Sequence, residues 1–535
     1  MSVLLFLIFS YILVCVTLYK VFPKAGVDGW KALVPGLNFI EWCKIIGRPA
    51  WWAALLLIPI VNIFIWVGIC VDMVRSFGKY DLKDSALAVI FAPISFFLLG
   101  KNDDAKYIGP TIKAEGDYAQ QLKEAHEKGD TREIKKLEYS NPYRKSEGRE
   151  WVESIVFAVF AAAFIRMFLI EAYVIPTPSM EGSLLVGDFL FVSKAHYGIR
   201  TPMTVLQFPL LHNTTPFVGT ESYLKSPSLG YHRLPAITNV KRNDPIVFNY
   251  PEGDSVYMAP GRTVSVHDIR RNPGYRRMVQ GRNLSLRVRP IDKRDHYIKR
   301  CVALPGDELQ IKNQKVFVNG EPAPEPSGVQ FNYVVTVKGD PSGPFNKTLN
   351  DKMDELGVNL NEINSGDGQS NREYALTKAQ VAVLQGMSEQ LSLAPSPYKV
   401  PPQLIFPHDP GNFGEWGVDD YGPIKIPKAG ESVVITPNNI AMYARIIRVY
   451  EKNEMNIKNG RIFINGKQAT NYTFQQDYYW AMGDNRHNSE DSRFWGFIPA
   501  DHMVGKPLFI WFSTKNGSIM NGIRWSRIFS SANKM

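Results

Sequence analysis

Cysteine is scarce in this chain, which has four among its 535 residues. No two of them form a Cys-x-x-Cys pair, and none has the Cys/His spacing of a zinc site, so we expect no metal and no other cofactor. Only Cys301 lies after residue 150, so the C-terminal part of the chain cannot contain an internal disulfide. We interpret Cys301 as a small buried apolar residue.

The chain also lacks a concentrated basic segment. Its net charge is +10, from 61 basic and 51 acidic residues, and these basic residues look widely spread, without an arm or helix face that gathers them. We therefore expect no nucleic-acid partner, and contact with a membrane surface explains the charge better. A charged fraction of 21% and an aromatic fraction of 12% exclude global disorder.

Long hydrophobic runs, in contrast, are present in the first hundred residues. Residues 1–19 form an uncharged apolar run, and no basic stretch or small-residue cleavage site marks it as a cleaved signal peptide. Residues 50–71 are the clearest span, with paired tryptophans at one end. Residues 86–99 are short and contain Pro93, as in a tilted span or a re-entrant segment. We predict a hydrophobic membrane module of two to three spans over residues 1–100.

A fourth apolar run covers residues 151–174 and carries Arg166 near its end. We predict a transmembrane anchor here, with Arg166 reaching towards one interface; a buried soluble helix is the alternative. Residues 101–150 are polar and predict a linker with an exposed helix. Basic residues just before the anchor place this linker in the cytoplasm and everything after about residue 175 outside. These basic residues are Arg144, Lys145 and Arg149.

After residue 175 the pattern changes to short alternating runs separated by Gly, Pro and Asn, which predict antiparallel strands. The expected fold is a mostly β exported domain behind several N-terminal transmembrane helices. We assign residues 175–322 and 455–515 to this catalytic β domain, residues 323–454 to an inserted second lobe, and residues 516–535 to a C-terminal tail. Within the insertion, residues 377–392 predict a helix.

One internal repeat stands out. LQIKNQKVFVNGEPA at 309–323 recurs as MNIKNGRIFINGKQA at 455–469. Each copy has the pattern of a strand, an Asn-Gln or Asn-Gly turn, a second strand and an Asn-Gly turn, which predicts hairpins. We expect the two copies to be paired edges of one sheet.

The first candidate for chemistry is Ser179, in Ile-Pro-Thr-Pro-Ser-Met at 175–180. The prolines on either side of Thr177 favour an extended backbone that presents the serine at a turn. A serine needs a base to act as a nucleophile. There is no Gly-x-Ser-x-Gly motif and no evident His/Asp pair. Taken alone, Ser179 is more simply a turn residue beside the membrane.

Lys299 supplies a candidate base. It lies in the strand-like run Tyr-Ile-Lys-Arg-Cys-Val at 297–302, where alternation predicts that either Lys299 or Arg300 faces inward. A lysine has an ordinary pKa of about 10.4, so it acts as a base at neutral pH only when burial lowers that value. A Ser-Lys pair is a known variant of the catalytic triad. Taken alone, Lys299 is as well explained as a surface residue of an edge strand.

A third candidate is the stretch GDNRHNSEDSRFWG at 483–496, whose composition predicts a turn. Ser489 is suited to accept a hydrogen bond from the lysine, and Asp491 and Arg493 to form a bidentate pair that braces the turn. A calcium loop is the competing interpretation, but the terminal Glu and central Gly of an EF-hand are missing.

Together these segments resemble the bacterial type I signal peptidases. That family has a transmembrane anchor followed by a Ser-Met motif, a basic-Gly-Asp strand, a Lys-Arg strand ending in Leu-Pro-Gly-Asp, and a Gly-Asp-Asn-Arg motif. This chain has all four in the same order: PTPSMEGSLLVGDFLFVSK at 176–194, KRNDPIVF at 241–248, YIKRCVALPGDELQI at 297–311 and MGDNRHNSEDSRFWGFIP at 482–499.

The resemblance implies a role for each matching residue. It makes Ser179 the nucleophile and Lys299 its general base. It implies an oxyanion hole made by the Thr177 hydroxyl and the Ser179 backbone N–H. Ser489 corresponds to the hydroxyl that positions the lysine. The remaining matches are structural support from Asp484, Asp491 and Arg493, and apolar pockets for small side chains lined by Ile175 and Ile298.

Some positions depart from the family pattern. Pro178 stands before the nucleophile where many members have glycine, KRND replaces Arg-Gly-Asp, and His487 occupies a position that is often acidic. The resemblance covers about residues 151–515 and leaves residues 1–150 unexplained. Archaeal and endoplasmic-reticulum relatives have histidine where Lys299 stands, so the lysine favours a bacterial enzyme.

The resemblance implies a serine endopeptidase of the bacterial cytoplasmic membrane, multi-pass, with its catalytic domain on the extracytoplasmic side. Its expected reaction is cleavage of signal peptides from preproteins after small residues of the Ala-x-Ala type. Preprotein signal peptides, the lipid bilayer and the secretion translocon are the expected partners. Two alternatives stay open: a specialised maturation peptidase for one secretion substrate, and a non-catalytic membrane scaffold.

Overall fold

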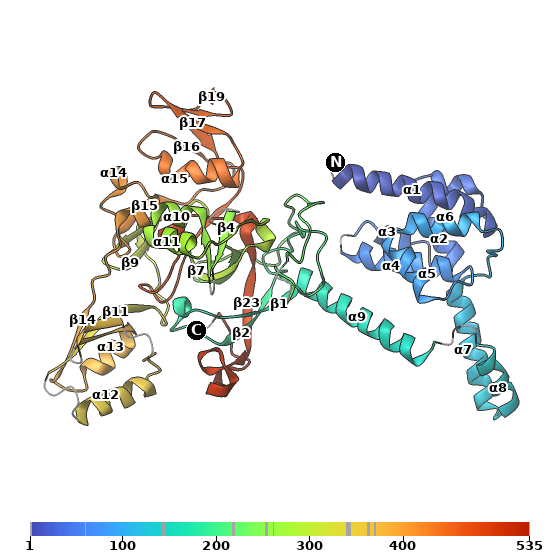
Figure 1. Ribbon diagram of the computed structural model, residues 1–535, viewed down its shortest axis with the longest axis horizontal. Helices are drawn as coiled ribbons and strands as arrows, with labels where there is room; N and C mark the ends of the chain where they lie inside the picture. The colour runs from blue at the N-terminus through green and yellow to red at the C-terminus, as the bar shows by residue number, and fades with distance from the viewer. Residues whose placement is uncertain are drawn as a thin grey trace. The chain divides into compact units, whose positions relative to one another are not determined.

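The protein is described from a computed structural model (Figure 1). It covers residues 3–58, 60–141, 143, 145–216, 220–251, 255–259, 262–338, 344–360, 364–368 and 371–533. Arg144, one of the basic residues before the predicted anchor, lies outside them. The chain forms two compact units, Met1–Ala161 and Ala162–Met535.

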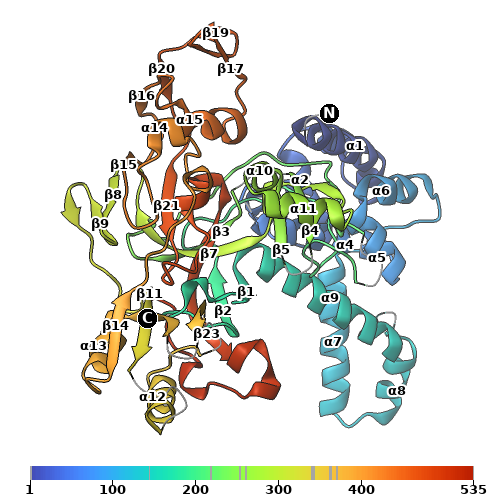
Figure 2. The same cartoon turned by 60° about the vertical axis from the view of Figure 1, so that its left-hand side comes forward.

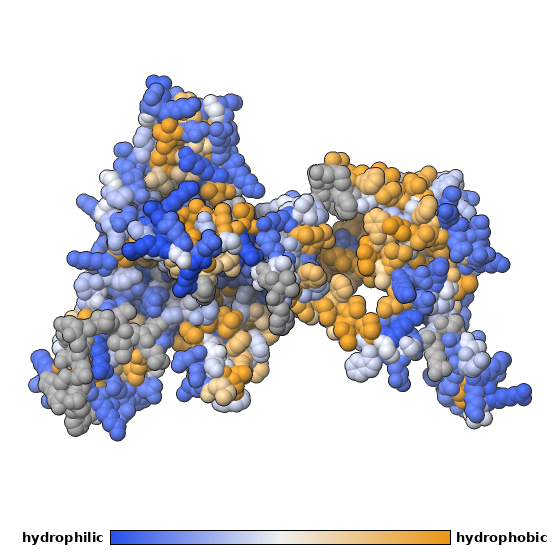
Figure 3. Space-filling model, in the orientation of Figure 1, coloured by the Kyte–Doolittle hydropathy of each residue, from blue (hydrophilic) through white to orange (hydrophobic). Residues whose placement is uncertain are grey.

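The N-terminal unit is helical, and its apolar side chains form a core of their own. Val14, Trp42, Ile69 and Phe96, from four different helices, are buried together in this core. Apolar side chains also cover the surface of the α1–α6 helices that faces the viewer in Figure 3. The helices are α1 (Val3–Lys24), α2 (Leu37–Ile46), α3 (Trp52–Leu55), α4 (Val61–Arg75), α5 (Leu82–Ile90), α6 (Ala92–Lys101), α7 (Thr111–Glu127), α8 (Thr131–Tyr139) and α9 (Glu147–Phe168).

The predicted spans at 50–71 and 86–99 are not continuous helices. The first run is divided between α3 and α4, and Ile60 adopts a left-handed backbone conformation with φ of 74° just before α4. The second run is divided between α5 and α6, at Phe91. A helix of ten residues such as α6 is about 15 Å long, half the thickness of the hydrocarbon core.

Within the described part of the chain, one helix is long and apolar enough to cross a bilayer, and this is α9. Only 6% of its apolar window is buried by the rest of the protein, so the helix is exposed around its circumference. The predicted anchor extended to residue 174, but the helix ends at Phe168. The residues beyond it form strand β1 (Ile170–Val174), because they pair antiparallel with β2 (Asp188–Ser193).

The predicted linker at 101–150 contains two helices, α7 and α8. They are separated by a turn in which Gly129 has a positive φ of 65°. Asp130 caps α8 by accepting hydrogen bonds from the backbone N–H groups of Arg132 and Glu133. The segment is therefore helical, as expected, but in two pieces.

The C-terminal unit is built on a seven-stranded sheet with the order β1-β2-β23-β3-β7-β21-β22. All neighbouring strands in it are antiparallel, which confirms the prediction of a mostly β domain after residue 175. β7 lies between β3 and β21, near the middle of the sheet. The remaining bounds are β3 (Pro245–Asn249), β7 (His296–Ala303), β21 (Tyr478–Met482), β22 (Ile498–Pro499) and β23 (Met503–Ser513).

Residues 516–533, assigned above to a C-terminal tail, pack back onto this sheet. The backbone N–H of Phe529 donates to the carbonyl of Ile510 in β23. The Arg527 guanidinium forms a two-pronged ion pair with Asp188 at the start of β2. The end of the described chain is therefore part of the β domain.

The predicted insertion contains a separate α/β lobe. Its sheet has the order β12-β13-β11-β14, and Val335, Met353, Leu376 and Leu384 belong to a core of its own. We call residues 329–396 the inserted lobe. Its predicted helix at 377–392 ends earlier, at Gln385. The bounds are β11 (Gln330–Val337), α12 (Pro344–Glu355), β12 (Asn364–Gly368), β13 (Asn371–Thr377), α13 (Lys378–Gln385) and β14 (Leu391–Pro395).

The two sequence repeats form the same hairpin, but the expectation that they pair in one sheet is wrong. Leu309 pairs with Val318 in the first copy, as Met455 pairs with Ile464 in the second. The first copy joins β15 (Tyr421–Lys425), whereas the second forms a sheet of its own. The strands are β8 (Glu308–Lys312), β9 (Lys315–Val318) and β10 (Glu321–Pro322), and β17 (Met455–Lys458), β18 (Arg461–Ile464) and β19 (Lys467–Gln468).

The second copy lies next to β16 (Ser432–Val434), α15 (Ile440–Arg445) and β20 (Asn471–Thr473). In Figures 1 and 2 this group and the inserted lobe project from opposite ends of the main sheet. Residues of the group, including Ile446 and Ile462, share a core with Leu309 and Trp480. It is thus an extension of the β domain.

Basic residues do gather in one place, contrary to the expectation from the sequence. Eight arginines and one aspartate lie between residues 262 and 289. This stretch forms part of a small sheet with two short helices between β3 and β7, and Figure 3 shows the surface of α10 and α11 as strongly hydrophilic. The elements are β4 (Ser255–Ala259), β5 (Arg262–Ser265), α10 (Val266–Arg271), α11 (Pro273–Gly281) and β6 (Leu286–Val288).

Candidate active site

Ser179 lies in a short 3-10 turn, Pro178–Met180, five residues after β1 ends. Pro178 suits the first position of this turn, where its missing N–H leaves no hydrogen bond unmade. Met180 is fully buried beside Ile175 in an apolar cluster, which anchors the turn. Ser179 itself is only 8% exposed, so its hydroxyl sits at the border between this cluster and solvent.

Lys299 reaches Ser179 from the middle of β7. Its Nζ donates to the Ser179 Oγ over 2.7 Å and to the Ile298 carbonyl over 3.0 Å. The lysine is 3% exposed, and its backbone is held opposite Ile246 of β3. The structure therefore brings the two side chains that the sequence singled out into direct contact.

Burial lowers the pKa of Lys299 from 10.5 to about 8. The ammonium loses its hydration inside the protein, which favours the neutral amine. The carboxylates of Asp491, Glu490 and Asp484 act in the opposite direction and limit the decrease. A substantial fraction of Lys299 is therefore unprotonated in mildly alkaline solution.

Arg300 is buried as well, so the prediction that only one of the two basic residues faces inward is wrong. It is 2% exposed and forms a bidentate pair with Asp484, with Nε–Oδ1 and Nη2–Oδ2 distances of 2.7 and 2.6 Å. Its guanidinium also donates to the Ser183 hydroxyl. Both faces of β7 are buried at this point, because Asp484 covers Arg300 on the side opposite Lys299.

Asp491 and Arg493 form the second buried pair, as predicted. The Arg493 Nε and Nη2 donate to the two carboxylate oxygens over 2.9 and 2.8 Å. Asp491 also accepts the backbone N–H of Gly483, while Arg493 donates to the Arg486 carbonyl over 2.6 Å. Burial raises the pKa of Asp491, but the charge and hydrogen bonds of Arg493 outweigh it, so the net shift is downward. We call residues 483–491 the 483–491 loop, and this pair closes it.

Ser489 is not brought into hydrogen-bonding contact with Lys299. Its hydroxyl is buried and makes no hydrogen bond of good geometry, although it lies near enough to Asp491 to help lower the pKa of that carboxyl. A Cβ added to Gly483 would lie 2.2 Å from the Ser489 Oγ and 2.4 Å from the Ser179 carbonyl. Ser489 thus lines the same confined space as Ser179.

The other predicted residues surround the serine. Thr177 is exposed at the start of the 3-10 turn, and its side chain makes no capping bond there. Ile175 is buried, and the half-buried Ile298 packs against the same apolar cluster. Both side chains thus belong to the apolar cluster that also buries Met180, the residue after Ser179.

Asn243 is a supporting residue that sequence reasoning passed over. It has a positive φ of 67°, and its carbonyl accepts a hydrogen bond from Arg300 over 2.7 Å. Asparagine is among the few residues that tolerate this conformation in place of glycine. The departure of KRND from Arg-Gly-Asp was the available signal, and it preserves the backbone shape.

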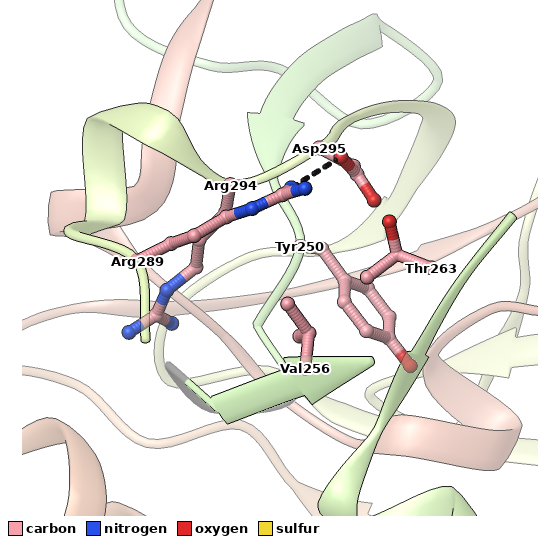
Figure 4. A pocket seen from close by; sticks show the side chains of 6 residues that line it. All are labelled: Tyr250, Val256, Thr263, Arg289, Arg294 and Asp295. Atoms are coloured by element: carbon pink, nitrogen blue, oxygen red, sulfur yellow. Dashed lines mark hydrogen bonds and ion pairs between the residues drawn. The ribbon is translucent and has the colours of Figure 1, made fainter. Parts of the chain in front are cut away.

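A small cavity of about 10 Å³ lies apart from these residues, beside β4 and β5 of the small sheet (Figure 4). It has room for about one water molecule, and Arg289 and Asp295 form an ion pair at its edge. It is too small for a peptide side chain and shares no residue with the predicted site. It is lined by Tyr250, Val256, Thr263, Arg289, Arg294 and Asp295.

Two known protein families match parts of this chain. The family described as signal peptidase, peptidase S26, matches residues 148–380 and 426–512, more than half of the chain. The chain belongs to the signal peptidase family. It is therefore a protease of the hydrolase class that acts in signal-peptide processing. Residues 30–110 match a second family, described as a family of unknown function (DUF5684).

Individual signal peptidases have low sequence identity to this chain, but the matches cover most of both proteins. Signal peptidase I of Buchnera aphidicola subsp. Baizongia pistaciae is 22% identical over 399 residues, covering 73% of this chain and 86% of the relative. Signal peptidase I of Helicobacter pylori is 24% identical, covering 71% of this chain and 90% of the relative. That of Haemophilus influenzae is also 24% identical, covering 72% and 76%.

Proposed function

We propose that this chain is a membrane-bound serine endopeptidase that removes signal peptides from exported preproteins, with Ser179 as nucleophile and Lys299 as general base. The observation that supports it most directly is the 2.7 Å contact between the Lys299 Nζ and the Ser179 Oγ. Both side chains are buried, and the lowered pKa of Lys299 suits a general base in mildly alkaline conditions. Family membership supports the same reaction class.

The reaction proceeds in two steps through an acyl-enzyme. Neutral Lys299 takes the proton from the Ser179 hydroxyl as its oxygen bonds to the scissile carbonyl carbon, whose π electrons move to oxygen. When this intermediate collapses, the C–N bond breaks and the leaving amine receives the proton from Lys299. A water molecule then attacks the ester and gives its proton to Lys299, which returns one to Ser179 as the acid product leaves.

The surroundings of the pair supply the other requirements of this chemistry. We assign the Thr177 hydroxyl and the Ser179 backbone N–H to the oxyanion hole, because the exposed Thr177 lies two residues before the nucleophile. An apolar floor made by Ile175 and Ile298 suits small side chains, as in an Ala-x-Ala site. Ser489 belongs to the wall of the confined space around Ser179.

Two buried ion pairs hold this arrangement. Asp484 neutralises Arg300, the neighbour of Lys299 in β7, and Asp491 neutralises Arg493. Without such partners the arginines would be buried charges, which are strongly unfavourable. We therefore assign Asp484, Asp491 and Arg493 to structural support of the catalytic pair.

We also propose that the chain is held in the bacterial cytoplasmic membrane, with the β domain on the extracytoplasmic side. The apolar, exposed helix α9 ends at Phe168, directly before β1, so Ser179 follows this helix by eleven residues. A multi-pass arrangement draws support from the apolar surface of the N-terminal unit, where Phe9, Ile12 and Val16 of α1 are more than half exposed.

The test is cleavage of a purified preprotein with an Ala-x-Ala site by the full chain in lipid. We expect cleavage after the second alanine by the wild type, and none by Ser179→Ala or Lys299→Ala. Cleavage by Lys299→Ala would show that the base is wrongly assigned. Cleavage of one secretion substrate alone would favour the specialised peptidase. No cleavage of any preprotein by folded wild type would favour the scaffold.

A further inference from the structure

His487 ties the 483–491 loop to parts of the chain that are remote in sequence. Its ring is 3% exposed, and both ring nitrogens are used. The Nδ1 accepts the backbone N–H of Asn332 in β11 over 3.2 Å, so the proton lies on Nε2. The Nε2 then donates to the Asp419 carboxylate, at 3.0 and 3.1 Å from its two oxygens.

Aromatic contacts fix the same ring from two sides. Tyr398 stacks on it with a centroid distance of 4.9 Å and an interplanar angle of 17°. Phe331 of β11 meets it edge-on at 5.4 Å. Tyr398 and Asp419 lie between residues 381 and 425, where the match to the signal peptidase family is interrupted. Two of the four partners of His487, Tyr398 and Asp419, thus lie outside the match to the family.

The backbone next to His487 is joined to the inserted lobe as well. The N–H of Gln330, at the start of β11, donates to the Asp484 carbonyl over 2.8 Å, and the Gln330 carbonyl accepts the N–H of Arg486 over 2.9 Å. These bonds form a parallel bridge between Gln330 and Asn485. β11 is therefore joined to the 483–491 loop at its first residue.

That loop contacts the catalytic pair directly. The N–H of Asn485 donates to the Ser179 carbonyl over 3.2 Å, and Asp484 holds Arg300 beside Lys299. A shift of the loop would move the serine turn and admit water around the lysine. Misplacement by about 1 Å can cost about 10²-fold in rate.

The inserted lobe also contacts the chain just after Ser179. A Cβ added to Gly182 would lie 2.0 Å from the Gly328 carbonyl, and one added to Gly328 would lie 2.5 Å from the Ser183 Oγ. Asn359 of the lobe donates to the Glu181 carboxylate over 3.3 Å. The lobe and its adjoining segment thus touch both the chain just after Ser179 and the 483–491 loop.

We propose that His487 is a positioning residue through which β11 and Asp419 hold the 483–491 loop, and thereby the contact between Lys299 and Ser179. The side chain does not touch the reacting atoms and acts through the loop. This proposal rests on the proposed function, since it concerns the rate of that reaction. It gives the inserted lobe a role in the geometry of the active site.

The test compares His487→Ala and His487→Gln with the wild type over pH 6 to 10, using the preprotein assay on the full chain in lipid. For His487→Ala we expect kcat to fall by about 10- to 100-fold with little change in KM. We also expect the acidic limb of the rate profile to move to higher pH, because water around Lys299 brings its pKa back towards that of an exposed lysine. Glutamine can still donate to Asp419, so His487→Gln should recover most of the loss.

His502→Ala is the matched control, because it removes another buried His-Asp contact, to Asp501 at 2.6 Å, away from the 483–491 loop. It should lower thermal stability without moving the pH limb. The proposal is overturned if His487→Ala lowers stability but leaves kcat and the limb unchanged. If His487→Ala does not fold, Asp419→Ala is the second variant, because it removes the carboxylate that accepts the hydrogen bond from His487. It must shift the acidic limb of the rate profile to higher pH as well.

A separate readout distinguishes failure of this proposal from failure of the proposed function. If the wild type cleaves no preprotein, the pH dependence of Ser179 labelling by a serine-directed fluorophosphonate reports the same Ser-Lys contact. A profile shifted by His487→Ala but not by His502→Ala would support the positioning role alone. Identical profiles in all three proteins would refute it.

Discussion

Replacing Lys299 by methionine should abolish cleavage and yet stabilise the β domain near neutral pH. In the folded protein burial lowers the pKa of this lysine to about 8, against 10.5 when exposed. A protonated Lys299 therefore destabilises the fold by about 3 kcal/mol. The substitution also loses the hydrogen bonds to Ser179 and to the Ile298 carbonyl, worth about 1 kcal/mol each. A net stabilisation of about 1 kcal/mol remains for Lys299→Met at pH 7.

The effect depends on pH with a definite sign. Below pH 8 Lys299 is protonated in both the folded and the unfolded state, so the full free-energy cost of burying its charge is present. Between pH 8 and 10.5 only the unfolded state keeps it, so the stability of the wild type rises with pH. By pH 10 the advantage of Lys299→Met should shrink by about 2 kcal/mol and reverse.

Cys301 provides the assay, because it is fully buried in β7, two residues from Lys299. The rate of maleimide labelling of Cys301, read by peptide mass spectrometry, reports local opening of this strand. We expect about fivefold slower labelling in Lys299→Met at pH 7 and faster labelling at pH 10. The exposed Lys315→Met serves as a control that should change neither rate. If the ratio of the Cys301 labelling rates in Lys299→Met and in the wild type were the same at pH 7 and pH 10, the argument would be refuted. Burial of the protonated Lys299 would then have no free-energy cost.

Further predictions follow from the same site. The kcat/KM of the wild type should rise about tenfold per pH unit up to a limb near pH 8; a limb near pH 6 in a constant-ionic-strength profile would point to another base. Asp491→Asn leaves Arg493 buried without its counter-charge and should cost about 3–5 kcal/mol in thermal or denaturant unfolding, whereas an unchanged midpoint would contradict the buried pair. Gly483→Ala places a Cβ 2.4 Å from the Ser179 carbonyl and should lower kcat by about 10²-fold while the protein stays folded; full activity would show that the 483–491 loop moves freely.

The local patterns of the β domain could be predicted from the sequence. The runs at 245–249, 296–303 and 503–513 are strands of the main sheet, because short segments rich in β-branched and aromatic residues and bounded by turn residues are typical of strands. The two repeated hairpins were also predictable, since each turn places an asparagine at positive φ, at Asn313 and at Asn459. Their assignment to one sheet failed because hairpin signals say nothing about which other strand pairs with the edge.

Predictions that assumed an element with one face in solvent and the other face buried were less successful. Alternation allowed either Lys299 or Arg300 to face inward, but the 483–491 loop covers the second face, and Asp484 makes the burial of Arg300 tolerable. The apolar run at 50–71 predicts one span, because hydropathy does not register a break in the helix such as the one before Val61, where Ile60 has a positive φ. The arginines at 262–289 are visible in the sequence, but a net charge summed over the whole chain does not show that they are clustered.

The sequence could not predict those contacts of the site that join residues far apart in the chain. The Lys299–Ser179 contact spans 120 residues, and it could be anticipated only because both residues lie in recognisable motifs. The contacts of His487 span 155 and 68 residues, and neither Asn332 nor Asp419 belongs to such a motif. A change at a familiar position, here a histidine where acidic residues are common, therefore marked a difference whose partners only the fold could identify. Under the proposed function, His487 connects the catalytic pair to the inserted lobe, and it is where the effect of that lobe on catalysis should be measured.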